Sequence, residues 1–121
     1  MKADATPVTL ADRAAEAAIR AILDVERPEE GIIGEEYGST REGASRVWVL
    51  DPIDGTRSFV GGRPIFGTLI ALIEDGVPIL GLIDQPISGE RWIGAAGQGT
   101  LFNGAPANTR KCAALAHAVQ A

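Results

Sequence analysis

Two aspartates held three residues apart are the clearest candidates for chemistry in this sequence. The segment Asp51–Thr56, which reads DPIDGT, directly follows the apolar run Val47–Leu50. Pro52 fixes its own φ angle and is expected to break the strand, and Gly55 permits a tight backbone path, so both carboxylates can face one point. Clustered carboxylates repel one another unless a hard cation lies between them, and Mg²⁺ is the natural occupant of such a site.

A third acid and a phosphate contact are available nearby. Glu35 and Glu36 follow the apolar pair Ile32–Ile33 and are expected at the end of a neighbouring strand. Two ions sharing such ligands would activate a water molecule and stabilise the leaving oxygen of a phosphate ester. The main-chain N–H groups of Gly55 and Thr56 suit phosphate oxygens, because glycine allows close approach and a following helical turn directs its dipole at the anion.

Each of these patterns also has an ordinary structural interpretation. Asp-Pro-x-Asp-Gly is typical of a surface turn, in which the aspartate caps the turn and proline and glycine supply the backbone angles. Adjacent glutamates such as Glu35 and Glu36 are commonly a solvated pair, and Asp12 has a structural interpretation as an acid near the start of a helix. Spacing alone therefore leaves a turn and a metal site both open.

An amphipathic helix is predicted to precede the acidic residues. Thr9 is a suitable N-cap, Asp12 follows where its carboxylate can accept orphan N–H groups, and Pro28 closes the segment. Apolar residues recur at helical spacing and charged residues fall on the other faces. The apolar set is Leu10, Ala14, Ala18, Ile22 and Val25, and the charged set is Arg13, Glu16, Arg20, Asp24 and Arg27.

After Gly31 the pattern changes to short β-prone runs separated by turn-forming residues. Asp75-Gly76 predicts a two-residue hairpin, because both residues tolerate the positive φ angles of a type I′ turn. Gly38–Gly43 is polar and glycine-bounded and is predicted to be a mobile loop. Ile65–Ile73 is apolar at almost every position, so both its faces are expected to be covered, at least one by helices. The predicted strands are Ile32–Ile33, Val47–Leu50, Ile65–Ile73, Val77–Ile83, Arg91–Ala95 and Thr100–Phe102.

Composition limits the functional classes. The 121 residues, 45% of them hydrophobic, fit a single folded unit. The formal net charge of -5, without any run of Lys or Arg, argues against nucleic acid as a partner. Cys112 is the only cysteine and cannot form an internal disulfide, which suits a reducing compartment. The longest apolar run, Leu69–Ile73, is far short of the ~20 residues that cross a bilayer, so a soluble cytoplasmic protein without membrane contact is expected.

Three motifs together resemble the inositol monophosphatase-like family of Mg²⁺-dependent, lithium-sensitive phosphatases. The family pattern Thr-Pro-Val-Thr-x-Ala-Asp is similar to Thr6–Asp12, Gly-Glu-Glu to Gly34–Glu36, and Trp-Val-Leu-Asp-Pro-Ile-Asp-Gly-Thr to Trp48–Thr56, in the same order and spacing. The resemblance covers almost the whole chain and favours the metal site over the turn. It implies an α+β fold with a mainly antiparallel sheet covered by helices, the N-terminal half of the layered αβαβα sugar-phosphatase fold. Residues 1–121 would then be a single partial domain.

The resemblance also implies a set of metal ligands. Glu35 and Asp51 would bind a first Mg²⁺ together with the carbonyl oxygen of Ile53, and Asp51 and Asp54 would bind a second. Glu36 has no strong role in the family. The segment that completes the second metal site in the family, a Trp-Asp motif, lies in a second half that would follow this chain.

The resemblance further implies how water and substrate are handled. Asp12 and Thr56 would form the pair that orients the nucleophilic water, with Glu35 assisting. The amides of Gly55 and Thr56, next to Asp54, would hold the phosphate. The reaction expected is direct attack of an activated water on phosphorus, without a covalent enzyme intermediate.

Residues beyond the central motif are similar to the histidinol-phosphatase branch of the family. Arg57–Phe59, Gly67–Leu72, Gly81–Pro86 and Gly89–Gly94 carry this similarity. L-histidinol phosphate is therefore the expected substrate, with myo-inositol 1-phosphate or another sugar or nucleotide phosphate as alternatives, and a homodimer is expected. Because family members are longer, a truncated product that only binds metal weakly or serves in association is a second alternative.

Overall fold

The computed structural model describes residues 7–55, 59–63, 66–109, 113–114 and 116. Predictions that concern Thr56, Ile65 and Cys112 therefore lie outside the described residues. One helix and eight strands occupy the described part of the chain. They are α1 (Pro7–Glu26), β1 (Gly31–Gly34), β2 (Gly38–Thr40), β3 (Arg46–Asp54), β4 (Gly67–Glu74), β5 (Val77–Gln85), β6 (Glu90–Ala95), β7 (Gly99–Phe102) and β8 (Ala105–Ala107).

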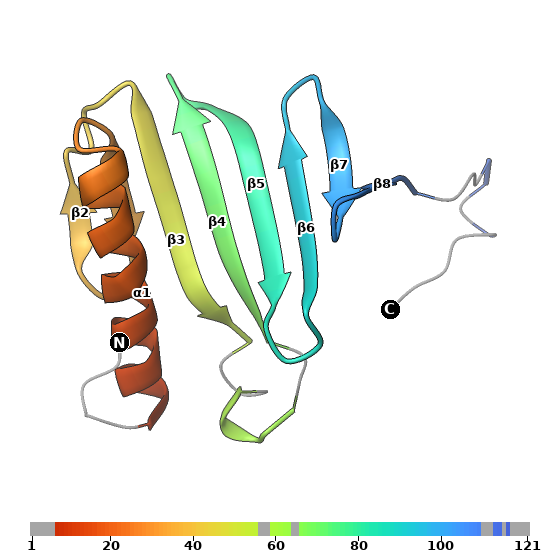
Figure 1. Ribbon diagram of the computed structural model, residues 1–121, viewed down its shortest axis with the longest axis horizontal. Helices are drawn as coiled ribbons and strands as arrows, with labels where there is room; N and C mark the ends of the chain where they lie inside the picture. Colours follow the sequence, from red (N-terminus) through yellow and green to blue (C-terminus); the bar gives the residue numbers. More distant parts are fainter. Residues whose placement is uncertain (1–6, 56–58, 64–65, 110–112, 115, 117–121) are drawn as a thin grey trace.

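The strands form one sheet in the order β2-β1-β3-β4-β5-β6-β7-β8 (Figure 1). From β3 onward each strand pairs antiparallel with the next along the chain, as expected for successive hairpins. Only β1 and β3 run parallel, because β2 turns back along the outer edge of β1 before the chain crosses to β3. The prediction of a mainly antiparallel α+β fold is confirmed.

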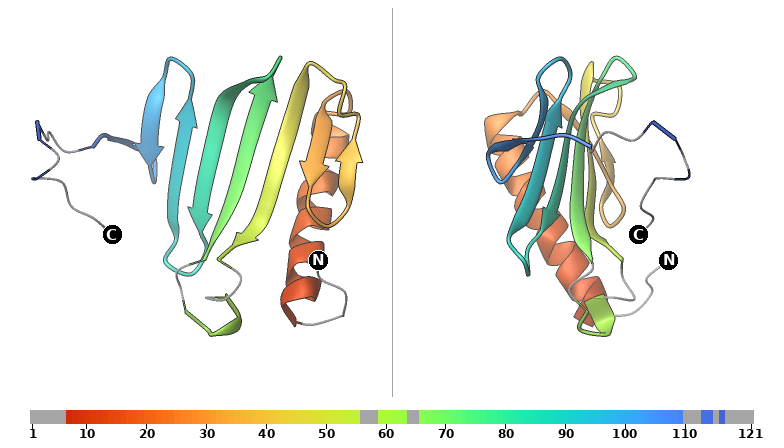
Figure 2. Two further views of the ribbon diagram at one scale, coloured as in Figure 1. Left: turned by 180° about the vertical axis from the view of Figure 1, so that it is seen from behind. Right: turned by 90° about the vertical axis from the view of Figure 1, so that its right-hand side faces the viewer.

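A single helix layer covers one face of this sheet near β1 and β3 (Figure 2). Beneath it lies the core, where Ile32 is 1%, Leu50 3% and Leu72 7% exposed. These side chains share the covered face, since Ile32 and Leu72 both pair with Trp48, two residues from Leu50. In the described ranges no helix lies on the other face, so the expectation that both faces of β4 are covered is not met there.

The helix differs from its prediction at its start. Because α1 spans Pro7–Glu26, Thr9 lies inside the helix rather than at an N-cap. Asp12 is the sixth residue of α1 and belongs to its second turn, too far along to accept the first orphan N–H groups. The C-terminal end agrees with the sequence, since the helix stops two residues before Pro28. Within the described residues, no helix has both the length and the apolar character needed to span a membrane.

The most buried of the described side chains of α1 are two acidic ones. Leu10, Ile22 and Val25 of the apolar set are 55%, 63% and 77% exposed, whereas Asp12 and Glu16 are 2% and 0% exposed. The prediction that charged residues fall on outward faces is therefore wrong for Glu16. Burying a carboxylate is costly unless hydrogen bonds compensate it, so these inward acids need partners from the sheet.

Two turns test the local predictions. Asp75 and Gly76 join β4 to β5 with φ angles of 49° and 82°, which confirms the type I′ hairpin. Gly38–Thr40, by contrast, is the edge strand β2, paired antiparallel with β1, and not part of a mobile loop. Its few polar residues have no apolar alternation, and pairing with β1 is what orders them.

Candidate functional site

The acidic segment lies at the end of β3, where the strand contains a bulge. Asp51 is opposite Leu69 in the β3–β4 ladder, but Asp54 is opposite Gly67. Three steps along β3 thus match two along β4, which is the arrangement of a β-bulge. Because Leu69 and Gly67 lie on the same face of β4, the bulge gives Asp51 and Asp54 a common face despite their odd spacing.

The prediction that Pro52 ends the strand is wrong, since β3 continues to Asp54. β1 pairs with β3 only as far as Leu50, so the missing N–H of Pro52 interrupts no bond to β1. On the other side of the strand, Thr68 Oγ1 donates a 2.7 Å hydrogen bond to the carbonyl oxygen of Pro52. A bulge held by this hydrogen bond, and not a turn, therefore gives the two aspartates a common face.

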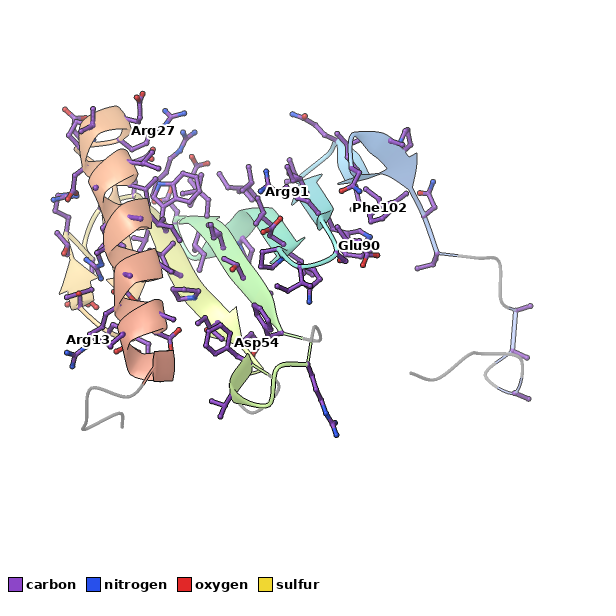
Figure 3. The ribbon with its side chains drawn as sticks, turned by 60° about the horizontal axis from the view of Figure 1, so that its bottom comes forward. Arg13, Arg27, Asp54, Glu90, Arg91 and Phe102 are labelled. Atoms are coloured by element: carbon purple, nitrogen blue, oxygen red, sulfur yellow. The ribbon has the colours of Figure 1, made fainter. Side chains whose placement is uncertain are left out.

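The apolar residues of this segment are buried, whereas its candidate metal ligands are more exposed. Pro52 is buried and Ile53 is 8% exposed, whereas Asp51 is half-buried and Asp54 is exposed at the end of β3 (Figure 3). The apolar residues thus hold the main chain in the core, while the carboxylates lie at the solvent boundary. The Ile53 carbonyl belongs to this anchored main chain, which limits how far it can move.

Glu35 is brought to the same edge by strand register. β1 and β3 are parallel, and Gly34, the last residue of β1, is paired with Leu50. Glu35 and Asp51 each directly follow this last pair, so both chains leave the β1–β3 ladder at the same edge of the sheet. Glu35 is exposed, which leaves its carboxylate accessible to a cation or to solvent.

Asp12 reaches this region from the helix layer. The N-terminal half of α1 and the C-terminal end of β3 lie at the same edge of the sheet (Figure 1). Asp12 is only 2% exposed, in contrast to the exposed Glu35 and Asp54. Burial therefore restricts the movement of the predicted water-orienting residue, which suits a group that must hold one orientation.

Glu16, one helical turn beyond Asp12, binds the turn that follows β1. The N–H of Glu36 donates to Glu16 Oε1 at 3.1 Å, and the N–H of Tyr37 donates to Glu16 Oε2 at 2.9 Å. Arg20 Nε donates to the same Oε2 at 3.0 Å. These three donors compensate the burial of the carboxylate, which is 0% exposed.

Gly34 gives Glu16 the space for these contacts. A Cβ at this position would lie closer than 3.0 Å to the carboxyl carbon and to both oxygens of Glu16. Any larger residue would therefore push the glutamate away from the turn. The glycine of the Gly34–Glu36 motif is explained by close approach of a side chain, not by an unusual φ angle.

Glu36 differs from the solvated residue that its sequence predicts. Its side chain is 8% exposed and forms an ion pair with Arg13 at 3.9 Å. Glu35 and Glu36 thus have separate environments, one accessible and one packed against α1. This division agrees with the prediction that Glu35, and not Glu36, is the functional member of the pair.

The donor set at this edge suits Mg²⁺ in its chemistry. Glu35, Asp51, Asp54 and the Ile53 carbonyl offer only oxygen atoms, the ligands that Mg²⁺ prefers. Across the residues described, however, no three His, Cys, Asp or Glu side chains form a group that could hold a metal ion. Mutual repulsion favours such separation, and a cation would offset it. The assignment of these residues to common ions stays a prediction.

The phosphate contact is described only in part. Gly55 has a φ of 93°, a backbone conformation that suits glycine. The N–H of Phe59 donates to the Gly55 carbonyl at 3.1 Å. Thr56, the second predicted phosphate contact and a predicted catalytic residue, lies outside the described residues. The expected helical turn after Gly55 begins in residues outside the described ranges and stays a prediction.

Three residues of this region were missed by the sequence analysis as contributors to a site. Glu16 and Gly34 fix the turn that carries Glu35, and Thr68 fixes the bulge between Asp51 and Asp54. The i, i+4 spacing of Asp12 and Glu16 was a usable signal, because it places both acids on one helix face. Nothing in the sequence around Thr68 distinguishes it from other strand threonines.

The chain is therefore an α+β protein in which the candidate acidic residues, on α1, directly after β1 and at the end of β3, lie at the same edge of one sheet. A family model, described as the inositol monophosphatase family, matches residues 1–121, and the chain belongs to that family.

Similar proteins agree with this assignment. The chloroplastic bifunctional phosphatase IMPL2 of Arabidopsis thaliana is 55% identical over 97% of this chain and 34% of its own length. A histidinol-phosphatase of Mycobacterium tuberculosis is 49% identical over 83% of this chain and 38% of its own. A solved structure of an inositol monophosphatase from Zymomonas mobilis is 62% identical with a TM-score of 0.81, covering 93% of this chain and 43% of that one. The chain thus spans well under half the length of these relatives.

Proposed function

We propose that this chain carries the metal-binding part of a Mg²⁺-dependent phosphomonoesterase that hydrolyses a small phosphate ester by attack of an activated water on phosphorus. The observation that supports the proposal is the position of the candidate oxygen donors at one sheet edge. Parallel register brings Glu35 beside Asp51, and the bulge gives Asp54 the same face as Asp51. Membership of the inositol monophosphatase family supports it.

The proposed roles follow from position and burial. Glu35, Asp51 and the Ile53 carbonyl would hold one Mg²⁺, and Asp51 and Asp54 a second. Bound Mg²⁺ would supply a lowered pKa for water and stabilisation of the leaving oxygen. Asp12, which is buried and so held in one orientation, would orient the water.

The remaining roles fall on Gly55 and Thr56, which directly follow β3. The N–H groups of Gly55 and Thr56 would bind the phosphate beside Asp54, and the Thr56 hydroxyl would share with Asp12 the task of orienting water. Residues outside this chain would have to complete the site, because the relatives are more than twice as long.

L-histidinol phosphate is the substrate we favour. Relatives from Mycobacterium tuberculosis and Chlorobaculum parvum, 49% and 46% identical, are named histidinol-phosphatases. The alternative is inositol 1-phosphate or another sugar or nucleotide phosphate, because a structure 62% identical to this chain is named an inositol monophosphatase. A second alternative is that the 121 residues alone form an inactive metal-binding or association fragment.

The decisive experiment is phosphate release by the full-length gene product with and without Mg²⁺. Asp51→Asn removes a charge proposed to serve both ions and should lower kcat/KM at least about 100-fold. Asp24→Asn, which changes a carboxylate paired with Arg41 at the other end of the sheet, is the matched control and should retain activity. Mg²⁺-dependent release that survives Asp51→Asn would contradict the proposal.

Two further measurements separate the alternatives. Initial rates on L-histidinol phosphate and myo-inositol 1-phosphate, compared at equal concentration, decide between the two substrates. The isolated 121-residue chain should show little turnover of either, because it lacks the greater part of the length of its relatives. Robust turnover by the isolated chain would show that these residues suffice.

A further inference from the structure

We propose that Glu16, supported by Arg20, is a positioning residue for the Glu35 carboxylate, and that it acts by fixing the main chain of the turn after β1. The inference rests on the proposed function, in which Glu35 binds metal. Glu35 is exposed, so its own packing does little to orient it. Its two neighbours in the chain, Gly34 and Glu36, both contact Glu16.

The contacts of Glu16 fix the turn at two successive amides. The N–H groups of Glu36 and Tyr37 bind different oxygens of the carboxylate, Oε1 and Oε2, so both oxygens are required. Arg20 Nε, bonded to Oε2, holds the plane of the carboxylate. Directly before Glu35, the absence of a side chain at Gly34 lets the carboxylate approach the main chain. Glu35 therefore lies between two points where its backbone meets one buried group.

Arg20 extends the attachment across the turn to β2. Its guanidinium donates from Nη1 to Thr40 Oγ1 at 3.1 Å and from Nη2 to the carbonyl oxygen of Gly38. The Arg20 side chain is 13% exposed, and its bond to Thr40 is partly buried, whereas its bond to Gly38 lies at the surface. Both sides of the Glu35 turn, β1 through Gly34 and β2 through Gly38, are thus tied to one turn of α1.

Stability alone does not explain a buried carboxylate at this position. Buried ion pairs can often be replaced by apolar residues of similar volume without loss of stability, because desolvation offsets much of the attraction. What an apolar residue cannot do is accept hydrogen bonds from the amides of Glu36 and Tyr37. The polar choice at Glu16 thus selects one conformation of the turn, and with it one direction for Glu35.

The test is Glu16→Gln in the full-length gene product. Glutamine keeps the shape but has one acceptor oxygen, so one of the two turn amides faces an NH₂ group. We expect the Mg²⁺ dissociation constant, measured by calorimetric titration, to rise about 10-fold, as for other residues that orient metal ligands. The KM for the phosphate ester at saturating Mg²⁺ should change less than about 2-fold, because substrate contacts are untouched. Glu26→Gln makes the same charge change at the exposed end of α1 and should leave both constants unchanged.

A double-mutant cycle with Glu35→Gln separates the two proposals. If Glu35→Gln alone leaves Mg²⁺ affinity unchanged, the ligand role of Glu35 fails. If Glu35→Gln weakens binding, Glu16→Gln should add little in that background, because its effect passes through the lost carboxylate. An equal effect in both backgrounds, or a lowered Tm with unchanged Mg²⁺ affinity, would overturn the positioning role. Should Glu16→Gln fail to fold, Gly34→Ala takes its place in the cycle, since its Cβ displaces Glu16 without changing charge.

Discussion

Beside α1, the acidic residues at the two ends of the sheet have different partners. At the end where α1 stops and β3 begins, acids are matched with arginines. Arg46 lies 2.6 Å from Glu74 and 3.8 Å from Glu30, and Arg41 lies 3.0 Å from Asp24. The hydrogen bond that Arg46 donates to the Glu74 carboxylate, together with the charge of that carboxylate, raises the pKa of Arg46. We call this the paired end.

The opposite end, which carries the candidate ligands, we call the site end. There the arginines of α1 form ion pairs with acids that are not candidate ligands. Arg13 pairs with Glu36, and Arg20 with Glu16. The two acids paired with α1 arginines, Glu16 and Glu36, are also buried, with side chains 0% and 8% exposed, while Glu35 and Asp54 are exposed. We therefore expect the exposed acids at this edge to have a functional role, because stability alone favours matched charges.

The largest expected difference between the site end and the paired end is in how Mg²⁺ changes the stability of the protein. If the site end binds the ion, Mg²⁺ at 100 times its dissociation constant should stabilise the full-length protein by about 2.7 kcal/mol. Thermal unfolding with Mg²⁺ and with EDTA measures this difference. Asp51→Asn should abolish it, whereas Glu74→Gln at the paired end should retain it. A Mg²⁺ effect of equal size in both variants would show that the ion does not distinguish the two ends.

A smaller effect, of about 1–2 kcal/mol, is expected from Glu30→Ala at the paired end. Trp48 Nε1 donates a 2.9 Å hydrogen bond to Glu30, whose side chain is 15% exposed, and this donor would lose its partner. Urea denaturation measures the loss, and Glu29→Ala, an exposed neighbour, is the control. The Mg²⁺ dissociation constant should not change. A change in Mg²⁺ affinity would contradict the separation of the two ends.

The smallest expected effect is a gain in stability, unlike the loss expected from Glu30→Ala. Without Mg²⁺, Asp54→Asn should raise the free energy of unfolding by up to about 0.5 kcal/mol, because it removes repulsion at an exposed position. With Mg²⁺ the same variant should be less stable than the wild type. The gain without Mg²⁺ should shrink at high salt, where surface charges are screened. Destabilisation by Asp54→Asn under both conditions would mean that Asp54 has a scaffold role.

Local patterns in the sequence predicted much of the fold. The Asp75-Gly76 hairpin is confirmed because its turn chemistry is decided by two residues. All six predicted strands lie largely within observed ones, since their apolar runs are bounded by turn residues. The sequence predicted that Glu35 lies at the end of a strand next to that of Asp51. In the parallel β1–β3 register both residues directly follow the last pair, Gly34 and Leu50.

What the sequence could not reveal depends on contacts between distant residues. Periodicity assigns charged residues to solvent, so it could not show that Glu16 is buried against amides 20 and 21 residues away. It also could not show a bulge at Pro52, because the bulge is defined by the register of β4. β2 was missed for the same reason, since its order comes from pairing with β1.

The bulge in β3 has a consequence for changes in chain length. On a regular strand, residues three apart point to opposite faces, and only the extra residue restores Asp51 and Asp54 to one side. Deleting one residue between them, or inserting one, would send one carboxylate to the helix-covered face without altering either acid. The segment should therefore accept many substitutions at Ile53 that keep its bulk, yet no insertion or deletion.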